Sequence, residues 1–301
     1  MKNQNTKIKT DETLRELIGH GNEEYPFAYY LEDIWLFDFH CVDWHWHSEV
    51  EFAYVKEGEA VLLIGSEQYQ LTEGNGVFIN SKIIHRFEAA GSVIFPNIVF
   101  SPQLLAPVGG MVYNKYIQPL LHSNISHQIL RKEIGWQQEV LDLLQAVFAL
   151  QEAEEENEMQ NISLLLKIWD LLWKHTEREG MVSDDKPDSQ NLARLQIMMQ
   201  YIHKNFSKHI TLDDIANEVA LSKSSVLNLF HQYLHTTPIN YLIHYRLRIA
   251  AKLLTSTQNN IASIAQETGF EWSDYFCRKF KKRYGITPGE YRKNAICIKE
   301  K

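Results

Sequence analysis

Hydrophobic and polar positions follow a strand-like pattern in the first third of the chain. From about residue 29 to residue 100, aromatic and β-branched runs are broken by polar, glycine-containing segments such as Glu57–Glu59 and Glu73–Gly76. Short runs at this spacing predict an all-β barrel or jelly roll, and helical periodicity is absent there. We therefore expect a β-barrel over residues 29–110, preceded by an N-terminal arm of residues 1–28.

A helical pattern replaces the strand-like one over residues 134–178. Apolar residues recur three and four positions apart, which predicts two amphipathic helices within a helical connector of residues 111–180. The two apolar stripes consist of Val140, Leu141, Leu144, Val147 and Phe148, and of Ile162, Leu165, Leu166, Trp169, Leu172 and Trp173.

These two helices allow two interpretations. Either they pack on their own domain only, or they also leave an apolar face for a second copy of the chain. Because Trp169 and Trp173 are large for a cap within one domain, we expect a homodimer interface here. In residues 181–191 the periodic pattern stops and Pro187 interrupts the chain, so we expect an interdomain linker there.

One hydrophobic pattern occurs twice near the end of the chain, about fifty residues apart. In each copy a small residue, Ala216 or Ala265, lies where two helices must approach closely, and another, Ala220 or Gly269, lies where the chain turns. Apolar residues then return at helical spacing, which leaves the opposite face free to contact DNA. They are Val226, Leu229 and Phe230 in one copy and Phe276 and Phe280 in the other. Two copies predict tandem helix-turn-helix units, because helical solenoids generally need three or more repeats.

Charge separates this part of the chain from the rest. Residues 191–301 contain 16 Lys and Arg against 8 Asp and Glu, whereas the preceding residues contain 14 against 30. A basic module attached to an acidic one is typical of a domain that neutralises DNA phosphates. The densest basic segment, Arg278–Arg283, lies on the second helix of the second copy, where a recognition helix is expected.

Residues 192–293 resemble the DNA-binding domain of AraC/XylS-type transcription regulators. The segments that carry the resemblance are Thr211–Ala216, Arg246–Leu254, Ile264–Phe270, Phe276–Lys281 and Gly285–Arg292. It implies a domain of residues 192–301 with seven helices, in which a long helix near residues 238–255 lets both units enter major grooves of double-stranded promoter DNA. Two such grooves on one face lie about 34 Å apart. It also implies RNA polymerase as a partner if the protein is an activator.

One departure from the family concerns the first unit, which carries Asn228 where an Arg is frequent and His231–Gln232 where basic residues are frequent. We expect this unit to bind phosphate less strongly than the second. Asn suits adenine and Lys suits guanine, whereas Lys282 is expected on the DNA backbone. The candidate DNA-contacting residues are Lys223, Ser224, Ser225 and Asn228 in the first unit, and Ser273, Asp274, Tyr275, Arg278, Lys279 and Lys282 in the second.

Four polar residues in the predicted barrel form a spaced motif. His45, His47 and Glu51 would share one face of an alternating strand, and His85 would come from a neighbouring strand. Two imidazoles, a carboxylate and a third imidazole can bind a divalent transition metal. The spacing resembles the two motifs of cupins, whose metal-binding members use these four positions.

The second cupin motif is matched only in part, since Asn80 and Lys82 stand where Pro and Gly are usual. In AraC-type regulators a cupin-like domain often serves as a sensor, so we expect the four residues and Trp46 to line an effector pocket, with no required cofactor and no catalysis. Aromatic and histidine walls favour a sugar or glycoside. Whether the four residues bind a divalent metal is left open. Two other functions are also left open: a cupin metalloenzyme with a DNA-binding appendage, and a ligand-independent regulator whose barrel only assembles or contacts a partner protein.

The whole chain is thus expected to combine α and β domains: a cupin-like β-barrel, a helical connector and an all-α tandem helix-turn-helix domain. Its 301 residues leave room for two domains. We expect no membrane partner, because neither a membrane span nor the apolar core of a signal peptide is present. Three widely spaced cysteines form no metal or redox motif. These features predict a cytoplasmic, nucleoid-associated protein.

Overall fold

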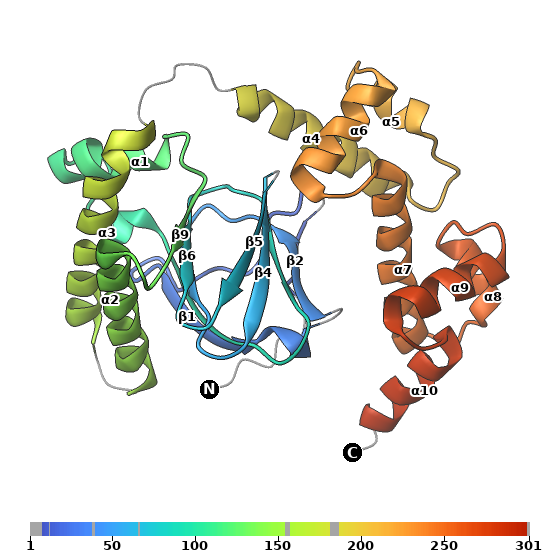
Figure 1. The fold of residues 1–301 in the computed structure, drawn as a ribbon. Helices are drawn as coiled ribbons and strands as arrows, with labels where there is room; N and C mark the ends of the chain where they lie inside the picture. The colour runs from blue at the N-terminus through green and yellow to red at the C-terminus, as the bar shows by residue number, and fades with distance from the viewer. Residues whose placement is uncertain are drawn as a thin grey trace. The chain divides into compact units, whose positions relative to one another are not determined.

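The structure is a computed structural model that describes residues 8–11, 13–37, 40–65, 67–153, 157–180 and 187–299 (Figure 1). The chain divides into two compact units, residues 1–186 and residues 187–301. In the described residues the first unit is rich in strands and the second is helical. The expected combination of a β-rich N-terminal region with an all-α C-terminal region is confirmed.

Two antiparallel sheets form the N-terminal unit. The five-stranded sheet has the strand order β1-β8-β3-β6-β9, and the four-stranded sheet has the order β2-β7-β4-β5. Their inner faces share one buried core, to which Val77 and Phe95 contribute from the first sheet and Leu62 and Phe87 from the second. This sandwich is compatible with the expected jelly roll. The strands are β1 (Phe27–Asp33), β2 (Cys41–His45), β3 (Val50–Tyr54), β4 (Glu59–Ile64), β5 (Glu67–Thr72), β6 (Gly76–Ile79), β7 (His85–Ala89), β8 (Ile94–Phe100) and β9 (His127–Leu130).

Helices α2 (Gly135–Glu152) and α3 (Glu158–Gly180) lie side by side and cover the outer face of the five-stranded sheet (Figure 1). Phe52 and Phe78 of the sheet, Leu141 of α2 and Trp169 of α3 belong to one buried core. The Trp169 ring lies edge-on to Phe78, with 6.2 Å between the ring centroids. The central strands are therefore buried on both faces. The shorter elements of this unit are η1 (Ile34–Leu36), η3 (Pro102–Leu104), η4 (Tyr113–Ile117) and α1 (Gln118–Leu121).

Two expectations for residues 111–180 need correction. The segment is not wholly helical, because β9 pairs with β6 and extends the five-stranded sheet. A strand of four residues between helical stretches is too short to give a clear periodic pattern. The size argument for a dimer interface fails for Trp169, which is 3% exposed and donates a hydrogen bond from Nε1 to the Tyr116 carbonyl at 2.9 Å. Trp173 is half-buried against the ring of Tyr116.

Seven helices make up the described part of the C-terminal unit, as the resemblance implied. They are α4 (Pro187–Asn205), α5 (Leu212–Glu218), α6 (Lys223–Leu234), α7 (Pro238–Ser256), α8 (Ile261–Glu267), α9 (Ser273–Tyr284) and α10 (Pro288–Lys299). Helix α7 takes the place of the expected long helix. Helix α4 begins inside the expected linker, whose residues 181–186 lie outside the described part. No described helix is both long and apolar enough to cross a membrane.

Caps and turns explain the two helix-turn-helix units, α5–α6 and α8–α9. The Ser222 hydroxyl accepts a hydrogen bond from the Ser225 amide at 3.1 Å and so caps α6. The turn residues Ala220 and Gly269 both adopt the left-handed conformation, with φ of 51° and 84°. A Cβ on Gly269 would lie 2.7 Å from the carbonyl oxygen of Phe206. The second turn therefore requires glycine, whereas the first tolerates alanine under strain.

Candidate effector cavity and DNA-binding face

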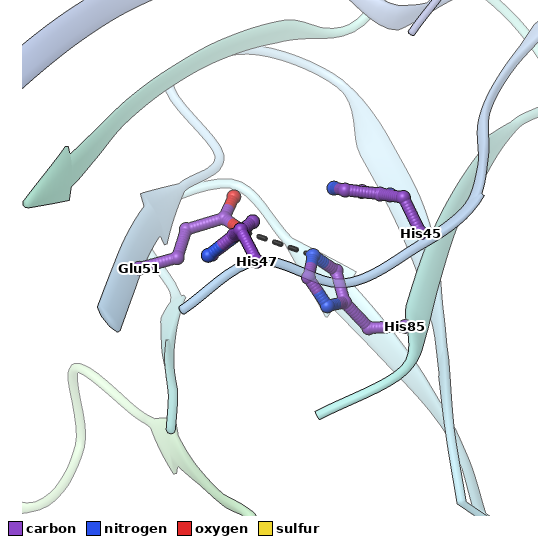
Figure 2. Close-up of side chains that lie close together, drawn as sticks. All are labelled: His45, His47, Glu51 and His85. Atoms are coloured by element: carbon purple, nitrogen blue, oxygen red, sulfur yellow. Dashed lines mark hydrogen bonds and ion pairs between the residues drawn. The ribbon is translucent and has the colours of Figure 1, made fainter. Parts of the chain in front are cut away.

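Four buried polar side chains converge between the two sheets (Figure 2). His45 ends β2 and pairs with His85 of β7 in the four-stranded sheet, whereas Glu51 lies on β3 of the five-stranded sheet. His47 lies on the segment between β2 and β3. One ligand atom from each of the four lies within 4.8 Å of the others, and none of these residues is more than 5% exposed. The structure thus brings together the four residues of the sequence motif.

The convergence has a different origin from the one expected. His45, His47 and Glu51 do not share a face of one strand, because the chain leaves the four-stranded sheet after His45 and enters the five-stranded sheet at Val50. A register shift between Val42 and His45 also interrupts the alternation in β2. The spacing therefore encodes a crossing from one sheet to the other.

Backbone carbonyl groups orient all three imidazole rings. Nδ1 of each ring lies 2.8–3.2 Å from the carbonyl oxygen of a residue two positions away in the chain. Because a carbonyl oxygen only accepts, each Nδ1 carries a proton, and a neutral ring then presents a lone pair at Nε2. Nε2 of His85 and Nε2 of His47 lie 3.0 Å and 3.3 Å from Oε2 of Glu51. Lone pairs and a carboxylate at these distances repel unless a proton or a metal ion lies among them.

Burial and neighbouring charges set the protonation states in this cluster. Burial, together with the charges of His85 and His47, holds the pKa of His45 well below its ordinary value, so this ring is neutral at pH 7. Burial by itself raises the pKa of the Glu51 carboxyl, but the imidazoles of His47 and His85, which face the carboxylate at 3.3 Å and 3.0 Å, outweigh it and hold that pKa well below the usual range. Glu51 is therefore a carboxylate.

The donor set fits a divalent first-row transition metal. Imidazole nitrogens and a carboxylate oxygen are common ligands of such ions, and hydrogen bonds from the second ring nitrogen to carbonyl groups are typical of ligating histidines. Nε2 of His85 is fully buried and has no hydrogen-bond partner with suitable geometry. His45, His47, Glu51 and His85 are the residues that could hold the ion.

A narrow cavity lies beside the cluster, with a volume of about 40 Å³. That volume holds a few water molecules or a hydrated ion, and it is too small for a sugar ring. Most of the polar residues that line this cavity lie outside the sequence motif. In β1, Tyr30 and Glu32 are two positions apart and therefore face the same side, which was the available sequence signal. The polar wall residues outside the motif are Glu16, His20, Tyr30, Glu32 and Asn97, and the apolar ones are Ile8, Ile18, Phe37, Val42, Phe87, Phe95 and Val99.

The ionised form of the Glu32 carboxyl group is disfavoured in this cavity wall. Burial and then the charge of Glu51 raise the pKa of the Glu32 carboxyl to about 7, and a long hydrogen bond of 3.5 Å from Asn97 lowers it only in part. Near neutral pH this side chain is therefore partly protonated and can either donate or accept a hydrogen bond. A hydroxyl group of a ligand could therefore donate a hydrogen bond to the ionised form of Glu32 or accept one from its protonated form.

The N-terminal segment closes this cavity. The Glu16 amide donates to the Trp46 carbonyl at 2.9 Å, and the Trp46 amide donates to the Leu14 carbonyl at 3.0 Å. Glu16 also lies 3.2 Å from His20, whose ring meets His47 edge-on with 5.3 Å between centroids. The expectation that Trp46 lines the pocket is wrong, since this residue is not part of the cavity wall and its Nε1 donates to a backbone carbonyl of the segment.

The first helix-turn-helix unit exposes three of its four candidate DNA contacts. Helix α6 buries its apolar face and leaves Lys223, Ser224 and Asn228 exposed, whereas Ser225 is half-buried. Lys223 forms an exposed ion pair with Asp213 at 2.8 Å. Such exposed pairs contribute little to stability, so Lys223 can exchange this partner for a DNA phosphate.

The second unit repeats this arrangement with more charge. Helix α9 buries Phe276 and Phe280 completely. Lys279 is half-buried, and its Nζ lies 5.3 Å above the ring of Tyr275. The exposed candidates are Ser273, Asp274, Arg278 and Lys282. The exposed side of α9 is therefore basic at two of the predicted contact positions, where α6 has only Lys223.

Comparisons with known proteins match both parts of the chain. Residues 215–294 match a family model described as a helix-turn-helix domain, and residues 41–97 match a model described as a cupin domain. A helix-turn-helix transcriptional regulator of Bacillus subtilis (strain 168), YdeC, is 29% identical over 293 residues, which cover 94% of this chain and 97% of that protein. The lactose operon transcription activator of Staphylococcus xylosus is 26% identical over 79% of this chain and 81% of its own length.

A solved structure is similar to part of the chain. It is a transcriptional regulator with an AraC-type DNA-binding domain from Chromobacterium violaceum, 30% identical, and it covers 36% of this chain and 96% of its own, with a TM-score of 0.34.

Proposed function

Since this chain is a transcription regulator of the AraC family with an N-terminal cupin domain, and not an enzyme, we propose that it binds promoter DNA through both helix-turn-helix units under the control of a small molecule. A ligand changes such binding only through its difference in affinity between two arrangements of the protein. The effector is proposed to occupy the cavity between the two sheets.

The repeated geometry of α6 and α9 carries the DNA-binding part of the proposal. Each helix buries an apolar face against its own unit and exposes polar or basic side chains on the other. A solvated basic helix end would account for two or three charges, but not for their position on a recognition helix. Phosphate contacts by several cations release counterions, so binding should weaken steeply as salt rises.

A binding measurement tests this part. The full chain is titrated onto duplex DNA from the promoter of the adjoining operon at several salt concentrations, with a scrambled duplex of equal length as the control. Tighter binding to the promoter than to the scrambled duplex, with log K falling linearly with log salt, is expected. Equal affinity for both duplexes would argue against sequence-specific recognition.

For the cavity we propose that a divalent metal held by the four motif residues is part of the effector site. The three oriented imidazole rings that converge on an ionised Glu51 support this. A larger effector gains access only when the N-terminal segment withdraws, because the closed cavity is small. We favour a sugar or glycoside, which the name of the lactose operon activator and the hydroxyl-compatible Glu32 support.

The change Glu51→Gln tests whether the cavity controls DNA binding. It keeps the shape of the side chain but removes its negative charge, so the effector-dependent change in promoter affinity should disappear while affinity without effector persists. Gln68→Ala, at an exposed position of β5 outside the cavity wall, serves as the control. A Glu51→Gln protein that still responds fully would support a ligand-independent role for these residues.

We also propose that the protein is a cytoplasmic homodimer that contacts RNA polymerase as an activator. Helices α2 and α3 leave an apolar groove that includes Ala146, Leu150 and Leu164, and Met159 beside them is 86% exposed. A second copy of the chain would cover this surface. Met159→Glu should shift the sedimentation coefficient toward that of a monomer, and an unchanged dimer would place the interface elsewhere.

A further inference from the structure

The two helix-turn-helix units differ sharply at one equivalent position. The offset of fifty residues that relates Val226 to Phe276 also relates Ser222 to Trp272. Ser222 caps α6 with its hydroxyl, whereas Trp272 stands at the N-cap of α9 and offers no side-chain hydrogen bond to the helix. The second unit thus gives up a stabilising cap at this position.

Packing within the second unit does not explain why a tryptophan stands at the position equivalent to Ser222. Trp272 is 70% exposed, and it is the most exposed of the seven tryptophans in the chain. An indole left in water gains little from the protein around it. A large apolar side chain in place of a capping serine indicates a contact with a partner rather than a contribution to the core.

The position of Trp272 identifies the partner. N-terminal residues of a recognition helix are those that approach base edges in the major groove. Three and seven residues further along α9 lie Tyr275 and Lys279, on the same side of the helix, and Arg278 is exposed in the next turn. The indole thus stands at the entry of the helix that carries Arg278 and Lys282, the exposed basic candidates of the second unit, whose complement is nucleic acid.

We propose that Trp272 contacts the C5 methyl group of a thymine in the major groove bound by the second unit, and so determines sequence preference there. The thymine methyl is the one apolar feature of base edges in that groove, and apolar side chains read it. This inference rests on the proposed DNA binding.

The test begins with a duplex selected from a random-sequence library by the full wild-type chain. Each thymine is then replaced in turn by deoxyuridine, which removes only the methyl group. At one position in the part protected by the second unit, wild-type affinity should fall about fourfold, the factor expected for one buried methyl group. The variant Trp272→Ser should bind the unmodified duplex more weakly and lose the response to deoxyuridine at that position.

The variant Trp272→Ser also controls for folding, since it restores the capping residue found at Ser222. Its melting temperature should be equal to or above that of the wild type. Trp272→Phe, which keeps an aromatic surface, should retain part of the response. Wild-type affinity that is unaffected by every deoxyuridine, or a Trp272→Ser protein that binds as tightly as the wild type, would overturn the assignment. Failure to select any duplex would instead overturn the proposed DNA binding, and this inference with it.

Discussion

Nε2 of His85 lies 3.0 Å from Oε2 of Glu51, and the two residues belong to opposite sheets of the N-terminal unit. The polar cluster therefore links the two layers of the sandwich at a point where the surrounding contacts are mostly apolar. Substitutions in it should affect ligand binding and the stability of the sandwich together, so the two effects must be measured separately.

Metal content gives the most direct test of this cluster. Protein purified without a His tag should contain about one equivalent of a first-row metal, and His47→Ala should lose it, because removal of one of four ligands weakens binding severely. Elemental analysis provides the measurement, and His122→Ala, outside the cluster, is the control. Metal-free wild-type protein that responds to its effector would assign the four residues to hydrogen bonding with the ligand.

Glu32 should make stability depend on pH. Its pKa is about 7 in the folded protein against an ordinary 4.5, so the unfolded chain ionises first as pH rises. The contribution of Glu32 to stability is therefore greatest below pH 4.5 and falls between pH 4.5 and 7. Glu32→Gln should raise the free energy of unfolding at pH 8 by about 1 to 3 kcal/mol and change it little at pH 4. Equal effects of the substitution on urea denaturation at both pH values would exclude this titration as the cause.

Arg278 and Asn228 occupy equivalent positions in the two units and should contribute unequally to DNA binding. Arg278→Ala should weaken promoter binding by roughly 1 to 3 kcal/mol and relax preference at one base pair. Asn228→Ala should weaken it less, because an uncharged contact releases no counterion. Fluorescence anisotropy with labelled duplexes measures both. A larger loss at Asn228 than at Arg278 would reverse the ranking of the two units, and a uniform loss for all sequences would make Arg278 a phosphate contact.

The two turn residues offer a matched pair of stability tests. Ala220 holds a φ of 51°, so Ala220→Gly should stabilise the first unit by about 0.5 to 1 kcal/mol through relief of left-handed strain. Gly269→Ala should destabilise the second unit by more than about 1 kcal/mol, since a Cβ would come within 2.7 Å of the Phe206 carbonyl oxygen. Thermal unfolding of the full-length variants compares the two, and the same sign for both would contradict the backbone assignment.

Sequence patterns predicted the local features of the C-terminal unit well. Its helices follow from local signals, such as the small turn residues Ala220 and Gly269 and the buried Phe230 and Phe280, which recur at fixed intervals. The cluster of His45, His47, Glu51 and His85 was also predicted, because its spacing resembles a known motif.

Features that depend on contacts distant in the chain were not predictable in the same way. The crossing between sheets after His45, the burial of Trp169 against Phe78 and the role of Trp46 in holding the N-terminal segment depend on which segments meet in space. Local periodicity carries no information on such pairings. The cavity residues Glu16 and Glu32 were missed for the same reason, since they are brought to the site by an arm and by a strand that has no motif.

Strand β3 connects the cavity to the helical layer within a single peptide unit. Glu51 faces the cavity, and the next residue, Phe52, faces the opposite side of the sheet, where it belongs to the core beneath α2 and α3. Both are at most 5% exposed, and close-packed interiors yield little to displacement. We therefore expect a ligand that displaces the Glu51 carboxylate to displace Phe52 as well, and so to change the packing beneath α2 and α3.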